Sequence, residues 1–247
     1  MKATPAMGSN KRVIVALDVE TASEARTIVR DLREDAAAFK IGLQLFTAAG
    51  PELVREIARE NRVFLDLKFH DIPNTVANAA VEAARLGVWM FNVHTSGGSE
   101  MMRRTIAGVA ELCTRENLPR PLVIGVTVLT SSDANSLTEI GIERSADEQV
   151  VELARLAAAS GLDGVVASPM EASRIRASVD KRDFIIVTPG VRPEFGTNDD
   201  QKRVMTPRQA VLEGSDYLVI GRPILRAKDR AAALRSVCEE IDSAENE

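Results

Sequence analysis

The stretch RVFLDLK, residues 62–68, has the composition of a buried β-strand but carries two charged residues near its end. Asp66 and Lys68 are two residues apart, so on a strand their side chains share one face, while Leu65 and Leu67 share the other. The leucines suit packing against helices, so the charged pair is predicted to point toward the open end of a barrel. Burying these charges elsewhere without partners would be costly.

Seven further runs of this kind occur along the chain, separated by segments with apolar residues at helical spacing, such as 22–34 and 147–160. This alternation predicts an α/β fold, a (β/α)8 TIM barrel with eight parallel strands. An open, doubly wound sheet would use the same alternation and is the alternative. The other seven strand candidates are residues 13–17, 37–43, 89–95, 122–129, 164–168, 184–190 and 217–221.

The length of 247 residues, 45% of them hydrophobic, is typical of one such barrel, although two smaller domains are possible on length alone. No linker rich in Pro, Gly or Ser and no block of charge divides the chain. We therefore expect a disordered lead-in at residues 1–10 and a single catalytic barrel domain at residues 11–247.

The charge and cysteine content argue against several classes of protein. The net charge is −5, with no dominant basic stripe, which argues against nucleic acid as a partner. No apolar run approaches the roughly 18 residues of a membrane span, and the N-terminus lacks the apolar core of a signal peptide. Cys113 and Cys238 are isolated, which argues against a structural zinc site and suits the reducing cytoplasm.

Charged residues gather where several predicted strands end, and catalytic groups of a barrel belong at that end. Asp18 ends the first strand, Lys40 lies in the second, and Asp66, Lys68 and Asp71 lie at or just after the end of the third. The simple interpretation is a single structural ion pair, but these five charged residues are more than one ion pair requires. Alternating Lys and Asp residues would hold one another ionised, ready to orient a substrate and deliver a proton.

The two histidines, His70 and His94, follow or end strands. A metal site with Asp66 or Asp71 is conceivable, but the spacing is not diagnostic, and structural histidines at the barrel rim are the preferred interpretation. No Ser-His or Cys-His pair is evident. We therefore predict neither a metal nor a cofactor.

A phosphate site is predicted after the seventh and eighth strands, where barrels often bind phosphate. Gly221 lets the backbone approach an anion, and Arg222 can clamp its oxygens. Pro189 ends the seventh strand, followed by Arg192 and then Gln201. The alternative interpretation is that these are ordinary turn residues whose charges are solvated.

The polar segment 191–205 interrupts the alternation of strands and helices. Loops this long in compact domains are usually functional or disordered. A lid that closes over a phosphate and excludes water would explain it, with Gly190 and Gly196 as flexible points.

The stretch DLKFHDIPNTV, residues 66–76, resembles the signature of the orotidine 5′-monophosphate decarboxylase family. Further blocks in the same order extend the resemblance along the chain: VALDV (15–19), FKIGLQLF (39–46), NVHTSGG (92–98), VTVLTS (126–131), TPGVRPEFGTNDDQKRVMTP (188–207) and VIGRPI (219–224). The resemblance implies a cofactor-free barrel enzyme that converts orotidine 5′-monophosphate to uridine 5′-monophosphate, the last step of de novo pyrimidine nucleotide synthesis.

The resemblance also implies a role for each matching residue. Lys68 would protonate C6 after carbon dioxide leaves, and Asp66 would lie beside the substrate carboxylate. Lys40 and Asp71 would complete the charged array, with Asp18 and Lys40 holding the ribose hydroxyls. The remaining binding residues are implied to be Thr130 near the pyrimidine and Pro189, Arg192, Gln201, Gly221 and Arg222 around the phosphate.

The family pattern further implies a homodimer, in which Asp71, Ile72 and Thr75 of one subunit reach into the site of the other. Two alternatives remain. A magnesium-dependent enzyme similar to hexulose-phosphate synthase or keto-gulonate-phosphate decarboxylase would share the D-x-K-x-x-D pattern, although the FHDIPNT continuation favours the orotidine enzyme. A non-catalytic phosphate-ligand sensor would keep Gly221 and Arg222 but would not require Asp66, Lys68 and Asp71 together.

Overall fold

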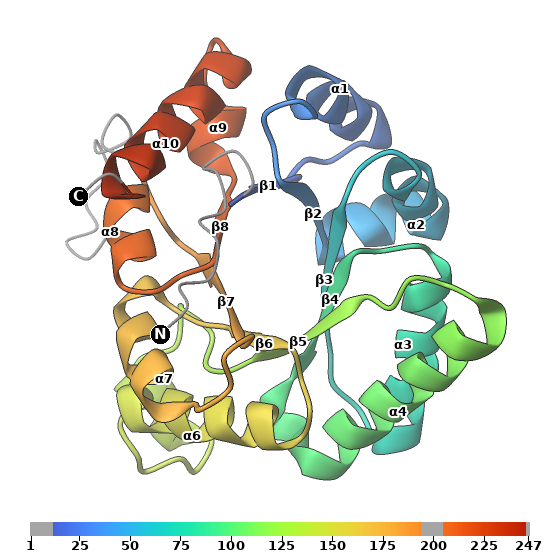
Figure 1. Ribbon diagram of the computed structural model, residues 1–247, viewed down its shortest axis with the longest axis vertical. Coiled ribbons are helices and arrows are strands. Elements are labelled where there is room, and N and C mark those ends of the chain that lie inside the picture. The colour runs from blue at the N-terminus through green and yellow to red at the C-terminus, as the bar shows by residue number, and fades with distance from the viewer. Residues whose placement is uncertain (1–11, 194–204, 246–247) are drawn as a thin grey trace.

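The computed structural model describes residues 12–193 and 205–245, so the predicted lead-in, Gly196 and Gln201 lie outside the described residues. Eight parallel strands form a closed barrel in chain order, with β1 paired to both β2 and β8 (Figure 1). The closure confirms the TIM barrel and rules out the open sheet. The strands are β1 Val13–Ala16, β2 Ala38–Gly42, β3 Val63–Phe69, β4 Met90–His94, β5 Leu122–Val126, β6 Gly164–Val166, β7 Ile185–Pro189 and β8 Tyr217–Ile220.

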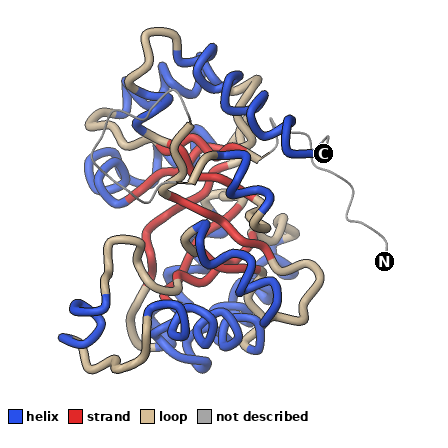
Figure 2. Tube along the Cα trace, turned by 90° about the vertical axis from the view of Figure 1, so that its left-hand side faces the viewer, coloured by secondary structure: helices blue, strands red, loops and turns tan. Residues whose placement is uncertain are grey.

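Helices surround the strands on the outside of the barrel, as the tube view shows for opposite flanks (Figure 2). Within the described ranges, none of them is long and apolar enough to cross a membrane. The α-helices are α1 Ala22–Leu32, α2 Leu43–Ala58, α3 Pro73–Arg85, α4 Gly98–Glu116, α5 Ala134–Glu139, α6 Ala146–Ala159, α7 Ala172–Ser178, α8 Pro207–Leu212, α9 Arg222–Leu225 and α10 Arg230–Glu245.

Helix α6 shows why these segments form helices where they do. Ser145 precedes it, and its hydroxyl accepts a hydrogen bond from the backbone N–H of Glu148, whose carboxylate accepts one from the N–H of Ser145. This reciprocal cap satisfies backbone donors that the first turn leaves unpaired. Buried residues then recur at helical spacing and pack the helix against the barrel: Val150, Leu153, Ala154 and Ala157.

Two apolar layers hold the barrel together. The larger one lies between the strands and the helices, and the smaller one fills the barrel interior. Alternate residues of β3 divide between them: Leu65 belongs to the outer layer and Phe64 to the inner one. The inner layer comprises Ile14, Ala16, Ala38, Phe64, Met90, Ile124, Val187, Tyr217 and Val219.

An aromatic cluster lies at the N-terminal end of the barrel. Trp89 immediately precedes β4, and its ring meets the ring of Tyr217, the first residue of β8, edge to face with centroids 5.1 Å apart. The guanidinium of Arg62 lies 5.4 Å from the Trp89 ring centroid, within cation–π range. These residues mark the end of the barrel opposite the carboxyl ends of the strands.

Strand β3 is irregular near its end. Leu65 pairs with Phe91 and Phe69 with Val93, so a step of four residues along β3 corresponds to a step of only two along β4. Lys68 within this bulge has φ of 52°, in the left-handed region that non-glycine residues seldom adopt. The strand is thus not regular at its end, but Leu65 and Leu67 both pack in the outer apolar layer, as predicted.

The other strands also end before the predicted ranges, by one to three residues. Strands β1, β5 and β6 end at Ala16, Val126 and Val166, earlier than the apolar runs in the sequence. The residues beyond them leave the sheet, and several instead line a cavity, including Ala167, Val128 and Leu129. These residues are apolar because they form the wall of this cavity, not because they pair in the sheet.

Candidate active site

A cavity of about 870 Å³ opens at the carboxyl ends of the strands. Its size falls within the roughly 300–1,000 Å³ of small-molecule sites. Most of the residues predicted from the sequence to form a site line it: Asp18, Lys40, Asp66, Lys68, Thr130, Pro189, Arg192, Gly221 and Arg222. The structure thus brings together residues as far apart in the sequence as Asp18 and Arg222.

Four side chains form a continuous alternating array along one wall of the cavity. Nζ of Lys40 lies 3.0 Å from Oδ1 of Asp18 and 3.5 Å from Oδ2 of Asp66. Nζ of Lys68 donates a hydrogen bond of 2.7 Å to Oδ1 of Asp66. The array brings together four of the five predicted Lys and Asp residues, in the order Asp18, Lys40, Asp66, Lys68, and does not include Asp71.

The array becomes more buried toward its centre. The side chains of Lys40 and Asp66 are 11% and 13% exposed, whereas that of Asp18 is 56% exposed. Burial acts to raise the pKa of Asp66, but Lys40 and Lys68 and the hydrogen bonds from Lys68 and Asn92 together hold that pKa below its ordinary value. Asp66 is therefore a carboxylate at neutral pH, flanked by two ammonium groups.

Asn92, on β4, is a site residue that the sequence reasoning missed. Its amide Nδ2 donates to Oδ1 of Asp66 at 2.7 Å, and its Oδ1 accepts from the backbone N–H of Lys68 at 2.8 Å. The side chain is buried, with 1% exposure. A polar residue within an otherwise apolar strand is the signal that could have found it.

The two histidines lie beside each other at the rim, with ring centroids 5.3 Å apart. Burial lowers the pKa of His94, and the charges of His70 and Lys68 lower it further. His94 is therefore neutral at neutral pH. No group of three or more His, Cys, Asp or Glu side chains that could hold a metal ion occurs within residues 12–193 and 205–245.

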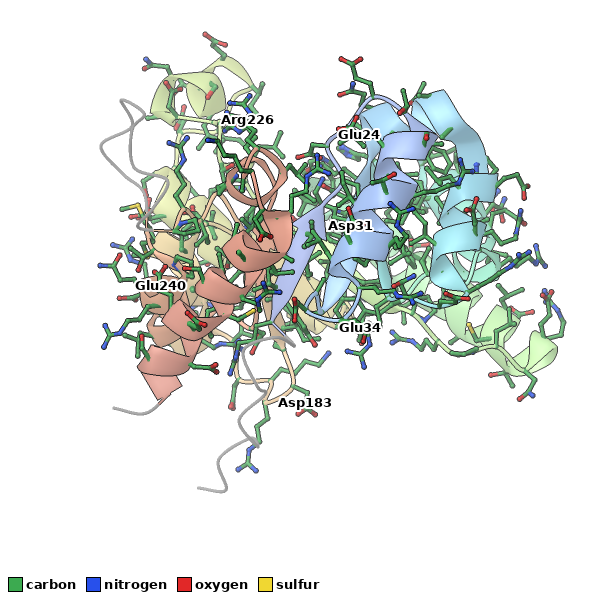
Figure 3. The ribbon with its side chains drawn as sticks, turned by 90° about the horizontal axis from the view of Figure 1, so that it is seen from above. Glu24, Asp31, Glu34, Asp183, Arg226 and Glu240 are labelled. Carbon is green, nitrogen blue, oxygen red and sulfur yellow. The ribbon has the colours of Figure 1, made fainter. Side chains whose placement is uncertain are left out.

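Arginines line the opposite side of the cavity, beyond β7 and β8. Arg192 and Arg222 both border it, as predicted. Arg226 does too, although the sequence reasoning did not select it; α9 turns the chain back so that this residue reaches the cavity. Figure 3 shows Arg226 at the end of the barrel opposite Asp183, which precedes β7. The three cations make this wall suited to an anion.

Gly221 is packed more closely than the sequence suggested. A Cβ at this position would lie 3.3 Å from both Ala16 Cβ and Asp18 Oδ2. The glycine therefore keeps room for Asp18, in addition to bordering the cavity.

Three predicted residues lie apart from the cavity lining. Asp71, Ile72 and Thr75, in the loop after β3 and the first turn of α3, are exposed. Asp71 accepts a hydrogen bond of 2.6 Å from the backbone N–H of Ile72. Ile72 is 67% exposed, which is unusual for a large apolar side chain beside a polar site.

Comparison with known proteins points to one family. The chain is 52% identical over 238 residues to orotidine 5'-phosphate decarboxylase of Syntrophotalea carbinolica, covering 96% of this chain and 97% of the relative. It is also 52% identical to the protein of that name in Moorella thermoacetica, over 96% of this chain and 94% of the relative.

Solved structures agree. The crystal structure of orotidine 5'-phosphate decarboxylase from Lactobacillus acidophilus superposes with a TM-score of 0.82 at 36% identity, over 94% of this chain and 99% of that one. A family model described as orotidine 5'-phosphate decarboxylase / HUMPS family matches residues 11–237. The chain therefore belongs to the orotidine 5'-phosphate decarboxylase / HUMPS family.

Proposed function

We propose that the protein decarboxylates orotidine 5′-monophosphate to uridine 5′-monophosphate, the last step of de novo pyrimidine nucleotide synthesis. The observation that carries the proposal is the array of Asp18, Lys40, Asp66 and Lys68 on one wall of the cavity. Relatives at 52% identity bear the name of this enzyme, which supports the same assignment.

The proposed substrate lies across the cavity with its phosphate at Arg192, Gly221 and Arg222. Arginine suits this role because its planar guanidinium can donate two hydrogen bonds to one phosphate. Gln201 is proposed to join the phosphate site but lies outside the described residues. Pro189 borders the phosphate end of the cavity.

The ribose and base are proposed to occupy the remainder of the cavity. Asp18 and Lys40 accept and donate hydrogen bonds to the ribose hydroxyls, and Thr130 lies near the pyrimidine. This orientation places C6 and its carboxylate toward Asp66 and Lys68, since those two groups occupy the far end of the array.

The reaction requires an acid at C6. When the bond between C6 and the carboxylate breaks, its electron pair stays on C6 and carbon dioxide leaves. The ammonium of Lys68 stabilises the developing negative charge and transfers a proton to C6, and solvent then restores the proton to Lys68. Asp66 keeps Lys68 in place and lies beside the substrate carboxylate; Lys40 and Asp71 complete the charged set.

We further propose that the enzyme is a homodimer in which Asp71, Ile72 and Thr75 serve the partner's site. Their exposure just after the strand that carries Asp66 and Lys68, and the large apolar surface of Ile72, support an interface there. We place the enzyme in the reducing cytoplasm, because both of its cysteines are buried free thiols.

The direct test follows the ultraviolet absorbance of orotidine 5′-monophosphate with purified protein, with and without a chelator. Conversion to uridine 5′-monophosphate that resists the chelator is the expected result. No conversion by folded protein would overturn the proposal, and turnover of a sugar phosphate that depends on magnesium would favour the hexulose-phosphate synthase type of reaction instead.

A further inference from the structure

Asn92 occupies a position that a barrel interior normally gives to an apolar side chain. It lies on β4 between Phe91 and Val93, and only 1% of it is exposed. Its side chain uses both ends of the amide, accepting from the Lys68 N–H and donating to the Asp66 carboxylate. A buried polar group with both ends satisfied is costly to disturb, because its partners would be left unpaired.

The first of these bonds supports the bulge of β3. Because β3 shifts its register against β4 between Leu65 and Phe69, regular pairing with β4 is interrupted at Lys68. The side chain of Asn92 accepts the hydrogen of the Lys68 N–H. Lys68 also has φ of 52°, a strained conformation that persists only where its surroundings fix it.

The second bond fixes the rotation of the Asp66 carboxylate. Oδ1 accepts from Asn92 Nδ2 and from Lys68 Nζ, both at 2.7 Å, while Oδ2 faces Lys40 at 3.5 Å. One amide group therefore holds both the backbone of Lys68 and the carboxylate that its ammonium contacts.

We propose that Asn92 is a positioning residue for the reaction, which aims the Lys68 ammonium by fixing the Lys68 backbone and the Asp66 carboxylate together. The inference rests on the proposed decarboxylation. Asn92 acts through Asp66 and Lys68, so its removal is expected to lower kcat more than it changes KM. Misplacement of a catalytic group by about 1 Å can cost about 100-fold in rate.

Two variants separate positioning from mere stability. Asn92→Leu has a similar size but makes neither bond, and its kcat is expected to fall about 100-fold at every pH. Asn92→Asp keeps the acceptor for the Lys68 N–H but places a carboxylate against Asp66. Two carboxylates at hydrogen-bond distance hold a proton between them at pH values where one alone would be ionised.

The kcat of Asn92→Asp is therefore expected to recover as the pH falls from 8 to about 5.5, since the introduced carboxyl group then donates to Asp66 as the amide did. The other charged or titratable groups facing Asp66 are Lys40, Lys68 and, more distantly, His94, with His70 beside His94. They are present in all variants, so a recovery found only in Asn92→Asp arises from the introduced group.

Thr95→Val is the matched control. It removes another buried side-chain hydrogen bond, from Thr95 Oγ1 to the Val126 carbonyl, without touching Asp66 or Lys68. We expect it to lower Tm without altering the pH dependence of kcat. If Asn92→Leu or Asn92→Asp does not fold, Asn92→Ser, which is smaller and polar, takes its place. We expect the kcat of Asn92→Ser to fall with little change in its KM.

The outcomes are distinct. Failure of the wild type to convert orotidine 5′-monophosphate overturns the proposed function. Wild-type turnover together with wild-type kcat in folded Asn92 variants, or an Asn92→Asp profile parallel to that of Asn92→Leu, overturns the positioning role.

Discussion

The ammonium of Lys68 lies 2.7 Å from Oδ1 of Asp66, a residue on the same strand, and the backbone between them departs from regular β geometry. Burial of Asp66 and the second ammonium at Lys40 make this an ion pair within an array rather than an isolated surface contact. Buried ion pairs are often no more stabilising than apolar side chains of similar volume, so the gathering of charge in this cavity is better explained by chemistry.

Replacement of Lys68 by Ala is expected to abolish measurable turnover while the fold survives, because Lys40, the second ammonium beside Asp66, contacts the other carboxylate oxygen and does not take the place of Lys68. Loss of one electrostatic group of this kind typically costs about 10²–10³-fold in rate, and loss of the proton donor adds to that cost. Steady-state kinetics and circular dichroism check both parts. Lys181→Ala, at the other end of the barrel, serves as the control, and near-normal activity of Lys68→Ala would sink the mechanism.

Arg222→Ala is expected to raise KM for orotidine 5′-monophosphate by about 10- to 100-fold, because a hydrogen bond to a charged group contributes about 1.5–3 kcal/mol. The nucleoside orotidine, which lacks the phosphate, should be processed equally poorly by both proteins. Arg182→Ala, on an exposed residue before β7, is the control for loss of positive charge. An equal effect on nucleotide and nucleoside would contradict the assignment of this wall to phosphate.

Ile72→Asp is expected to convert a dimer into a monomer and to lower activity at least about 10-fold, because it places a charge on a large apolar side chain proposed to be buried by the partner. Sedimentation velocity measures the change in mass. Ile140→Asp, at a side chain of similar exposure after α5, should leave the dimer intact. A wild-type protein that sediments as a monomer would show the interface proposal to be wrong.

Glu171→Gln is expected to change how stability depends on pH. Burial of this carboxyl group beside β6 raises its pKa to about 7. An ordinary glutamate titrates near 4.3, so the folded state binds the proton more tightly and loses stability as the pH rises from about 4.3 to about 7. The variant should therefore gain Tm relative to the wild type at pH 8 but not at pH 4.5.

Glu143→Gln, at an exposed position, is the control for this measurement. Taking the difference in Tm between variant and wild type removes the contributions of other groups, including Asp66, whose lowered pKa acts in the opposite direction at lower pH. A difference in Tm that does not depend on pH would contradict the raised pKa of Glu171.

The barrel and the charged wall could be predicted because both follow from local patterns. Apolar runs of strand length alternate with amphipathic segments, and parallel strands bring their carboxyl ends to one edge, so Asp18, Lys40 and Asp66 had to lie near one another. Arg222 follows from the same rule, since it comes directly after a strand, whereas Thr130 was implied only by the family resemblance.

The rest depends on contacts between distant segments. The bulge at Lys68 arises from the register of β3 against β4, which no local residue preference specifies, and Asn92 becomes informative only when its strand is seen beside that bulge. Arg226 reaches the cavity through the turn of α9. The contacts that we propose Asp71 and Ile72 make with a second subunit cannot be seen in the structure of one chain.

The cluster of Arg62, Trp89 and Tyr217 gives the protein a natural optical reporter. Trp89 is the single tryptophan of the chain and lies at the end of the barrel remote from the cavity. Its fluorescence emission should change when the barrel unfolds and should not change when a ligand binds in the cavity. If activity is lost at a lower denaturant concentration than the one at which the emission changes, the active site unfolds before the rest of the barrel.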